Sequence, residues 1–249
     1  MHRFFSQINT VEHLSETDIK NPPHYLEAIK ALERLTYASL YIIDYHKKAF
    51  EYVSENPLFL CGHTAKEVQQ MGYEFYFKYV TAEDLDFLIK VNQIGFSFYE
   101  QIPLSERKSY TISYDFHVKP EGSQRILLHQ KFTPLCLTET GKIWKGLCVT
   151  SLSTEQNVGK VTITKLGTNK IFLYNFSTGK WEPEEKISLS DREKEIIQLS
   201  VRGFTIRDIA EEIFVSTETI KFHRKKAFEK MGVTNIAEAI SFATNNKLL

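Results

Sequence analysis

The sequence predicts an α+β protein in which an antiparallel sheet with flanking helices is followed by an all-helical domain of four helices. Short strand-like and helix-like segments alternate between residues 24 and 155. Four helix-capping signals then follow one another closely after residue 187. Aromatic residues make up 13% of the 249 residues, which favours strand-containing structure over a purely helical bundle.

The chain divides into four segments of different character. The first is polar and ends at Asn21-Pro22-Pro23. The third is too apolar around Lys170–Phe176 to be a flexible linker, so we expect it to pack on a neighbouring domain or on a second copy, with Trp181 as its anchor. The predicted segments are an N-terminal arm (1–23), an α+β domain (24–155), a strand-containing connector (156–186) and a helical domain (187–249).

The elements of the second segment follow from its hydrophobic pattern. Apolar residues at three-residue steps predict a helix over Tyr25–Leu35, and a second helix should begin at Ala82-Glu83-Asp84. Short helices or loops are expected over Pro57–Met71. The predicted strands, each bounded by turn residues, are Ser39–Asp44, Ala49–Val53, Tyr110–Val118, Arg125–Pro134 and Lys145–Leu152.

Each C-terminal helix begins at a polar residue that is able to cap its first turn. These residues are Ser190, Thr205, Ser216 and Asn235. Gly203 and Gly232 are placed to end the first and third helices in a left-handed conformation. Only Phe214 and Val215 separate the second helix from the cap of the third. This tight connection is typical of a helix-turn-helix.

The third of these helices has two different sides. At about 100° per residue, one side groups the residues expected to face the core: Ser216, Ile220, His223, Ala227 and Met231. The other side presents Glu218, Lys221, Phe222 and Lys225, flanked by Arg224 and Lys226. A basic outer face suits the DNA major groove, where lysine donates to guanine O6 and N7 and an apolar ring contacts the thymine methyl group. The alternative is an ordinary solvated face.

The C-terminal sequence resembles the LuxR/GerE-type DNA-binding domain over about 60 residues. The resemblance rests on Leu189-Ser190-x-Arg192-Glu193-x-Glu195-Ile196-Ile197, Gly203-x-Thr205-x-x-Asp208-Ile209-Ala210, Val215-Ser216-x-x-Thr219-Ile220-Lys221-x-His223 and Lys230-Met231-Gly232-Val233. It implies base contacts from Lys221, Phe222 and Lys225. It implies phosphate contacts from Thr205, Arg207, Ser216, Thr219, His223 and Arg224. It also implies a dimer that uses the last helix. Lys226, Ala227 and Ile236 depart from the usual pattern, which affects site preference and the dimer contact.

The order of elements in the second segment resembles a PAS domain, with a GAF-like domain as the nearest alternative. Asn56 after the second strand and the stretch Tyr79–Asp84 fit this resemblance. PAS domains bind small molecules, haem or flavin between sheet and helices, or mediate dimers. His117 and His129 are candidate haem ligands, but a histidine on a strand is more often structural. No cysteine has the neighbours of a flavin-reactive site, so the cofactor stays unassigned.

Composition excludes several classes of function. The net charge of +0 gives no support for nucleic-acid binding beyond local basic faces. Cys61, Cys136 and Cys148 are widely spaced and indicate reduced core thiols rather than a metal site. No apolar run approaches the ~20 residues that span a membrane. The sequence also contains no nucleophile elbow, glycine-rich phosphate loop or metal-spaced His/Cys set, so we expect no enzyme.

The sequence therefore predicts a sequence-specific DNA-binding transcription regulator that acts as a dimer in the cytoplasm. Its PAS-like domain would serve signal sensing or dimerisation. The alternative is a protein-interaction adaptor whose helix-turn-helix does not bind DNA. The expected partners are double-stranded DNA and a second copy of the chain, with RNA polymerase and a small-molecule ligand as further candidates.

Overall fold

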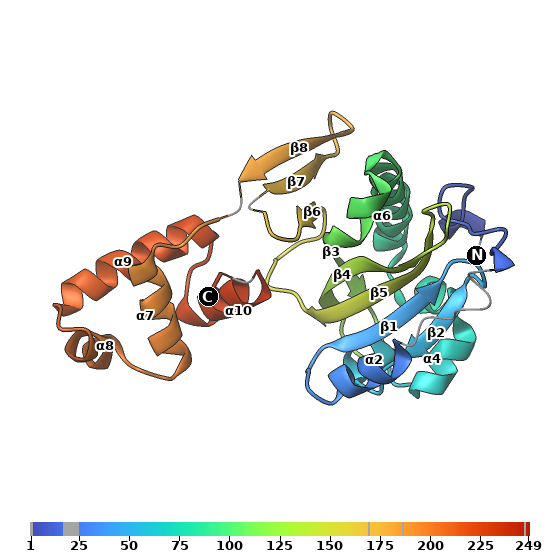
Figure 1. The fold of residues 1–249 in the computed structure, drawn as a ribbon. Coiled ribbons are helices and arrows are strands. Elements are labelled where there is room, and N and C mark those ends of the chain that lie inside the picture. The colour runs from blue at the N-terminus through green and yellow to red at the C-terminus, as the bar shows by residue number, and fades with distance from the viewer. Residues whose placement is uncertain (1, 17–24, 169, 186, 247) are drawn as a thin grey trace. The chain divides into compact units, whose positions relative to one another are not determined.

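The computed structural model describes residues 2–16, 25–168, 170–185, 187–246 and 248–249 (Figure 1). The chain forms two compact units, Met1–Glu184 and Glu185–Leu249. The first unit contains the sheet and its flanking helices, and the second contains the C-terminal helices. This arrangement confirms the predicted α+β class. No helix in the described ranges has both the length and the apolar character needed to cross a bilayer.

The first unit is built on a sheet of eight strands in the order β2-β1-β5-β4-β3-β6-β7-β8. Each pair of neighbouring strands with a defined register is antiparallel. The strands are β1 (Ser39–Asp44), β2 (Ala49–Val53), β3 (Tyr110–Val118), β4 (Ile126–Leu137), β5 (Ile143–Leu152), β6 (Val161–Lys165), β7 (Lys170–Asn175) and β8 (Lys180–Glu185).

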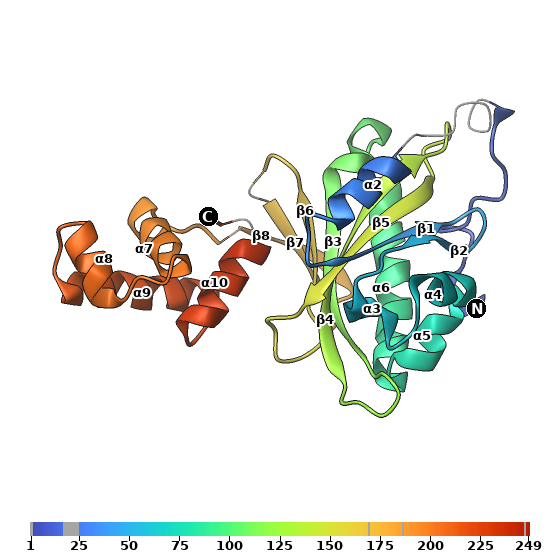
Figure 2. The same cartoon turned by 90° about the horizontal axis from the view of Figure 1, so that it is seen from below.

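Helices pack on both faces of the sheet, because side chains alternate along β1 (Figure 2). Leu40 and Ile42 pack against α2 (Leu26–Glu33) through Ile29. Tyr41 and Ile43 point to the opposite face and join the main core. The helices whose residues join this main core are α3 (Pro57–Leu60), α4 (Ala65–Met71), α5 (Glu74–Tyr79) and α6 (Ala82–Gln101).

The predicted elements agree with the structure at β1, β2 and β3, which have the expected bounds. Strand β4 continues past the predicted Pro134 to Leu137, and β5 begins at Ile143 instead of Lys145. Both differences arise because the pairing of the two strands continues past a register shift to Leu137↔Ile143. Helix α5 was not predicted, and neither was the length of α6.

Residues 156–186, which the sequence assigns to a connector, contribute strands β6, β7 and β8 to the same sheet. Strand β6 pairs with β3, with Ile112 opposite Ile163. Trp181 lies with its ring centroid 5.2 Å from that of Phe98 in α6 and 5.1 Å from that of Tyr174. The connector thus packs on the N-terminal domain, and Trp181 anchors it as expected.

The described part of the expected N-terminal arm packs on the same unit. Phe4 and Val11 are buried in its main core. The chain break expected at Asn21-Pro22-Pro23 lies outside the described residues.

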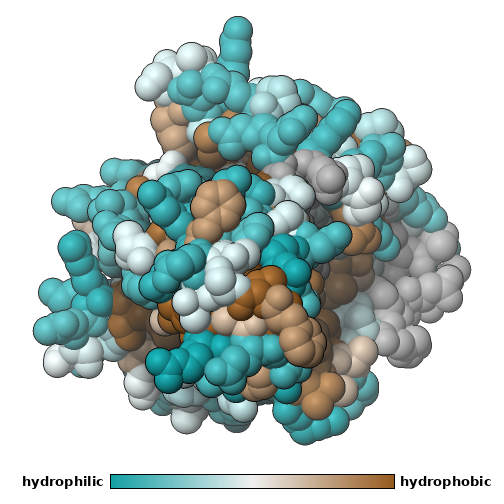
Figure 3. Space-filling view, turned by 90° about the vertical axis from the view of Figure 1, so that its left-hand side faces the viewer, coloured by the Kyte–Doolittle hydropathy of each residue, from teal (hydrophilic) through white to brown (hydrophobic). Residues whose placement is uncertain are grey.

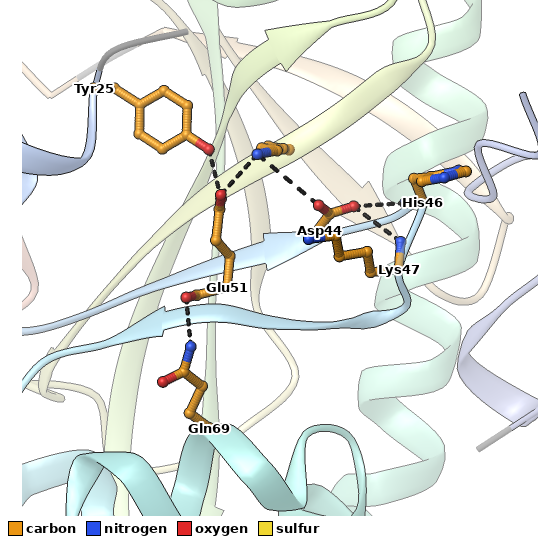
Figure 4. Close-up of polar contacts among 7 residues, drawn as sticks. Tyr25, Asp44, His46, Lys47, Glu51 and Gln69 are labelled. Carbon is orange, nitrogen blue, oxygen red and sulfur yellow. Dashed lines mark hydrogen bonds and ion pairs between the residues drawn. The ribbon is translucent and has the colours of Figure 1, made fainter. Parts of the chain in front are cut away.

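A buried ion cluster holds the start of α2 to the sheet (Figure 4). The Lys145 ammonium lies 2.7 Å from the Glu51 carboxylate and 3.9 Å from that of Asp44. Tyr25 donates its hydroxyl to Glu51, and Gln69 donates to the Glu51 backbone carbonyl at 2.6 Å. Burial and the neighbouring carboxylate of Glu51 raise the pKa of Tyr25, so this hydroxyl stays protonated and able to donate.

The second unit contains the four predicted helices, α7 (Asp191–Val201), α8 (Ile206–Glu212), α9 (Thr217–Met231) and α10 (Ile236–Asn245). All four expected caps accept a hydrogen bond from a backbone N–H in the first turn of their helix. Gly203 and Gly232 have φ angles of 85° and 67°, which confirms the expected left-handed ends. Ile220 packs with α7 and α8, whereas Ala227 and Met231 pack with α7 and α10, so α9 contacts all three other helices.

Candidate nucleic-acid interface

The connection between α8 and α9 is a tight turn around Phe214. The Val215 N–H donates to the Ala210 carbonyl at 3.0 Å, and Ser216 is already the N-cap of α9. Phe214 has a φ angle of 54°, a left-handed conformation that costs a non-glycine residue free energy. Its side chain is 94% exposed, so burial of the ring does not offset this cost.

One side of α9 packs into the unit. Ile220, Ala227 and Met231 are buried, as predicted. His223 is half-buried at the edge of this side. Ser216 was expected on the core side but is exposed. It is the N-cap of α9 and has an extended backbone, so the helical period does not apply to it. Phe228 was not singled out in the sequence, yet it packs against Ala227, Met231 and their neighbours.

The opposite side of α9 presents cations and an aromatic ring to solvent. The side chains of Lys221 and Lys225 are 57% and 80% exposed, and Phe222 is 55% exposed. The Lys226 ammonium lies 4.5 Å from the centroid of the Phe222 ring. Arg224 is half-buried, and burial lowers its pKa; its guanidinium lies 5.5 Å from the Phe228 ring centroid. The space-filling view in Figure 3 shows a largely hydrophilic surface with apolar side chains among the polar ones.

Two acidic residues contact the exposed lysines. Glu218 lies 3.0 Å from the Lys221 ammonium, and Glu229 lies 3.9 Å from that of Lys225. Exposed pairs on one helix face are worth only about 0.3–0.5 kcal/mol. Both lysines are therefore free to exchange these partners for a phosphate or a base at little cost.

Four of the residues expected to contact phosphate lie at the start of α8 or of α9: Thr205, Arg207, Ser216 and Thr219. Arg207, Ser216 and Thr217 line one shallow depression together with Phe214. The Thr205 hydroxyl donates to Asp208 at 2.8 Å, and the Ser216 hydroxyl oxygen accepts from the Thr219 N–H at 3.1 Å. These hydroxyls already cap helices. The N–H groups at the start of α9 carry the positive end of its dipole, which favours an anion there.

An ion pair between the buried Glu193 and the partly exposed Lys230 links the start of α7 to the end of α9. Glu193 is 2% exposed and accepts from the Ser190 N–H at 2.7 Å. The Lys230 ammonium lies 2.7 Å from the same carboxylate and also donates to the Ser188 carbonyl at 3.3 Å. Burial alone would raise the pKa of Glu193, but these hydrogen bonds outweigh it and lower the pKa. The sequence did not single out this pair, which fixes the orientation of α9.

The candidate haem ligands of the first unit are held by carboxylates. His117 Nδ1 lies 2.8 Å from the Asp84 carboxylate, and His129 Nδ1 lies 3.0 Å from that of Asp115. Neither histidine lines the internal cavity of this unit. Among the described residues, no group of three or more His, Cys, Asp or Glu side chains is arranged to hold a metal ion.

Residues 187–243 match the family model of bacterial regulatory proteins of the luxR family. The C-terminal unit is a LuxR-type helix-turn-helix domain. The match covers α7, α8, α9 and most of α10, including the surface formed by α8 and α9. It confirms the resemblance inferred from the capping and turn motifs.

Relatives and solved structures extend this comparison. The oxygen regulatory protein NreC of Staphylococcus aureus (strain MRSA252) is 29% identical over 162 residues, which are 65% of this chain and 70% of NreC. The VqmA dimer of Vibrio cholerae, described as a LuxR-type receptor, is 17% identical and matches with a TM-score of 0.36 over 90% of this chain and 88% of that chain. The N-terminal domain of a diguanylate cyclase with PAS/PAC sensor from Marinobacter aquaeolei is 12% identical and matches with a TM-score of 0.35 over 46% of this chain and 94% of that chain. The LuxR-type domain and the NreC relatives show that the protein is a DNA-binding transcription regulator.

Proposed function

We propose that the protein recognises specific double-stranded DNA sites by placing α9 in the major groove. Lys221, Phe222 and Lys225 contact base edges in this proposal. The observation that carries it is the exposure of all three side chains on the side of α9 opposite Ile220, Ala227 and Met231. Lysine donates to guanine, and the Phe222 ring packs on a thymine methyl group.

The proposed phosphate contacts surround this reading face. Arg207 supplies a cation, and the starts of α8 and α9 supply backbone N–H groups beside Thr205, Ser216 and Thr219. His223 and Arg224 lie at the half-buried edge of α9, where they contact the backbone of the DNA strand along that side. These contacts set the register of the helix and carry no sequence information directly.

We propose that two copies bind together, with their α9 helices in successive major grooves about 34 Å apart or a small multiple of this distance. Native mass spectrometry of the full-length protein tests this stoichiometry. A dimer, free or on DNA, supports it, and a single copy on a DNA duplex that contains two half-sites contradicts it.

The first unit serves signal sensing or dimerisation in this proposal. Its first five strands have the order β2-β1-β5-β4-β3, with helices α3 to α6 inserted between β2 and β3, and this order supports the proposal of a PAS-like domain. RNA polymerase is a further proposed partner, and the cytoplasm, where bacterial DNA lies, is the proposed location. No step of this function requires enzyme activity.

The alternative, an adaptor that does not bind DNA, is tested by removing the reading cations. We expect the double variant Lys221→Ala/Lys225→Ala to lose binding to sequences that the wild type selects from a random duplex library. The matched control is Lys66→Ala/Lys90→Ala, which removes the same charge from exposed positions of the first unit. If the wild type selects no sequence, the adaptor is favoured. If both double variants bind like the wild type, the site assignment is wrong.

A further inference from the structure

The first unit encloses a cavity between α6 and the inner face of the sheet. Its walls are aromatic and aliphatic, with a few polar side chains and no charged one. Its lining includes Phe4, Val91, Asn92, Gly95, Tyr114 and Gln130. A buried ion without a partner is costly, so such walls select an electrically neutral molecule.

Phe4, close to the N-terminus, forms part of one wall of the cavity. Phe4 is 5% exposed, and its ring centroid lies 5.3 Å from that of Tyr73 and 5.5 Å from that of Tyr76. Its carbonyl oxygen accepts hydrogen bonds from Asn92 Nδ2 at 2.5 Å and from Asn9 Nδ2 at 2.6 Å. One benzene ring therefore already occupies a place at the edge of the cavity.

The segment that carries Phe4 is held by packing of Phe4 and Val11 on the main core and by several polar contacts. Arg3 pairs with Asp86 at the surface. The Lys142 ammonium donates to the Gln7 carbonyl at 3.1 Å, and His46 Nδ1 lies 2.9 Å from the Val11 carbonyl. These polar contacts are individually weak, so the free-energy cost of opening the segment is set mainly by the burial of Phe4 and Val11.

The size of the cavity decides what enters it. With Phe4 in place its volume is about 50 Å³, whereas an apolar cavity that binds benzene measures roughly 150 Å³. A ring-sized molecule therefore does not fit beside Phe4. Such a molecule fits once the Phe4 ring has moved out of the wall, because the space left behind has the shape of an aromatic ring.

We propose that this cavity binds a neutral, single-ring aromatic molecule that carries a hydrogen-bonding group, and that Phe4 closes the site by occupying the ring position. This inference rests on the sensing role proposed for the first unit, and it names the class of ligand. Entry of the ligand requires the N-terminal segment to release Phe4, so binding is coupled to opening of that segment.

The polar groups on the floor of the cavity define the hydrogen-bonding group of the ligand. Gln130 Nε2 donates to the Tyr114 hydroxyl at 2.9 Å, while Gln130 Oε1 accepts from Tyr41. The Tyr114 oxygen accepts in this contact, which leaves its proton to be donated. Burial raises the pKa of Tyr114, so this proton is retained. The ligand therefore presents an acceptor, such as a hydroxyl, carbonyl or ring-nitrogen atom, to Tyr114.

Calorimetric titration of the full-length protein with phenol, and with benzoate as the charged analogue, tests the site. We expect phenol to bind the wild type weakly and Phe4→Ala at least about tenfold more tightly, because the wild-type affinity is reduced by the small population of the open state. Benzoate at neutral pH should bind neither. Phe5→Ala is the matched control, since Phe5 contacts Tyr73 but does not line the cavity.

A second substitution locates the bound phenol. Val91→Phe in the Phe4→Ala background fills the cavity and should remove the gain in affinity. Unchanged tight binding by this double variant would place phenol elsewhere and overturn the proposal. So would the absence of phenol binding by Phe4→Ala when its circular dichroism matches that of the wild type.

Hydrogen exchange tests whether Phe4 closes the site. The Ser6 N–H donates to Asn9 Oδ1 at 2.6 Å and reports on the closed segment. Saturating phenol should accelerate exchange over residues 4–11 of the wild type. Bound phenol without faster exchange overturns the closing role.

The same preparations separate this inference from the proposed function. Phe4→Ala leaves α9 untouched, so DNA binding should persist. Intact DNA binding without phenol binding refutes the cavity site alone. Phenol binding by a wild type that selects no DNA refutes the proposed function alone.

Discussion

The Lys230 ammonium at the end of α9 lies 2.7 Å from the carboxylate of Glu193, a residue of α7 that is only 2% exposed. Lys230→Ala leaves this buried acceptor without its cation. We expect a loss of about 1–3 kcal/mol in the free energy of unfolding, measured by urea denaturation of the full chain. Lys225→Ala is the control, because its pair with Glu229 is exposed and should contribute about 0.5 kcal/mol or less. Equal losses in the two variants would contradict the special role of Lys230.

The same pair predicts a pH dependence. The pKa of Glu193 is lowered in the folded state from its usual value of 4.5. The unfolded chain then binds more protons in the acid range, so the pair stabilises the protein above the unfolded pKa, and this stabilisation is lost as the pH falls through the folded pKa. The stability difference between wild type and Glu193→Gln should therefore shrink below about pH 4.5. A difference that grows with acidity would reverse the sign and refute the assignment.

The cluster around Lys145 in the first unit gives a larger expected effect. Lys145 and Glu51 side chains are 10% and 25% exposed. Replacement of one partner of a buried pair costs about 3–5 kcal/mol, because a charge is left without compensation. We expect Lys145→Met to lower the unfolding midpoint of the first unit strongly and Lys145→Met/Glu51→Gln to recover part of the loss. Lys165→Met breaks a more exposed pair with Glu106 and should change stability little. A double variant less stable than Lys145→Met would argue against the pairing.

DNA binding should separate the reading residues from the phosphate-binding ones. Lys225→Ala should cost about 1–3 kcal/mol on the selected site and relax preference at one base position. Arg207→Ala should weaken binding uniformly across sequences and reduce the slope of log affinity against log salt by about one unit. Fluorescence anisotropy on selected and scrambled duplexes over a salt series measures both quantities. The roles are reversed if Arg207→Ala alone changes base preference.

Local patterns in the sequence predicted the C-terminal domain well. Capping residues, glycine ends and helical period depend on neighbours a few positions away, and these neighbours are visible in the sequence. Ser216 was placed wrongly because the helical period was extended to a residue that precedes the helix. The pairing of Glu193 with Lys230 joins positions far apart in the chain, and no local pattern encodes it.

The first unit shows the same limit on a larger scale. The strands β1, β2 and β3 were predicted from strand-like runs bounded by turn residues, but the pairing of β6 with β3 depends on which edge is free in the folded sheet. The cavity depends on how Phe4 and Gly95 approach it from distant parts of the chain. A search for apolar residues near the N-terminus would have found Phe4. The proposal that its ring closes the cavity follows only from the folded structure.

Strand β8 ends at Glu185 and α7 begins at Asp191, so only a short stretch of chain joins the sheet to the LuxR-type domain. Six residue steps span about 20 Å at full extension. In a dimer held by the first units, the start of each α7 thus lies within about 20 Å of the end of its own β8. The separation of the two β8 ends then limits the half-site spacings that both copies are able to bind at the same time. Lengthening this stretch should widen the range of spacings that the protein accepts.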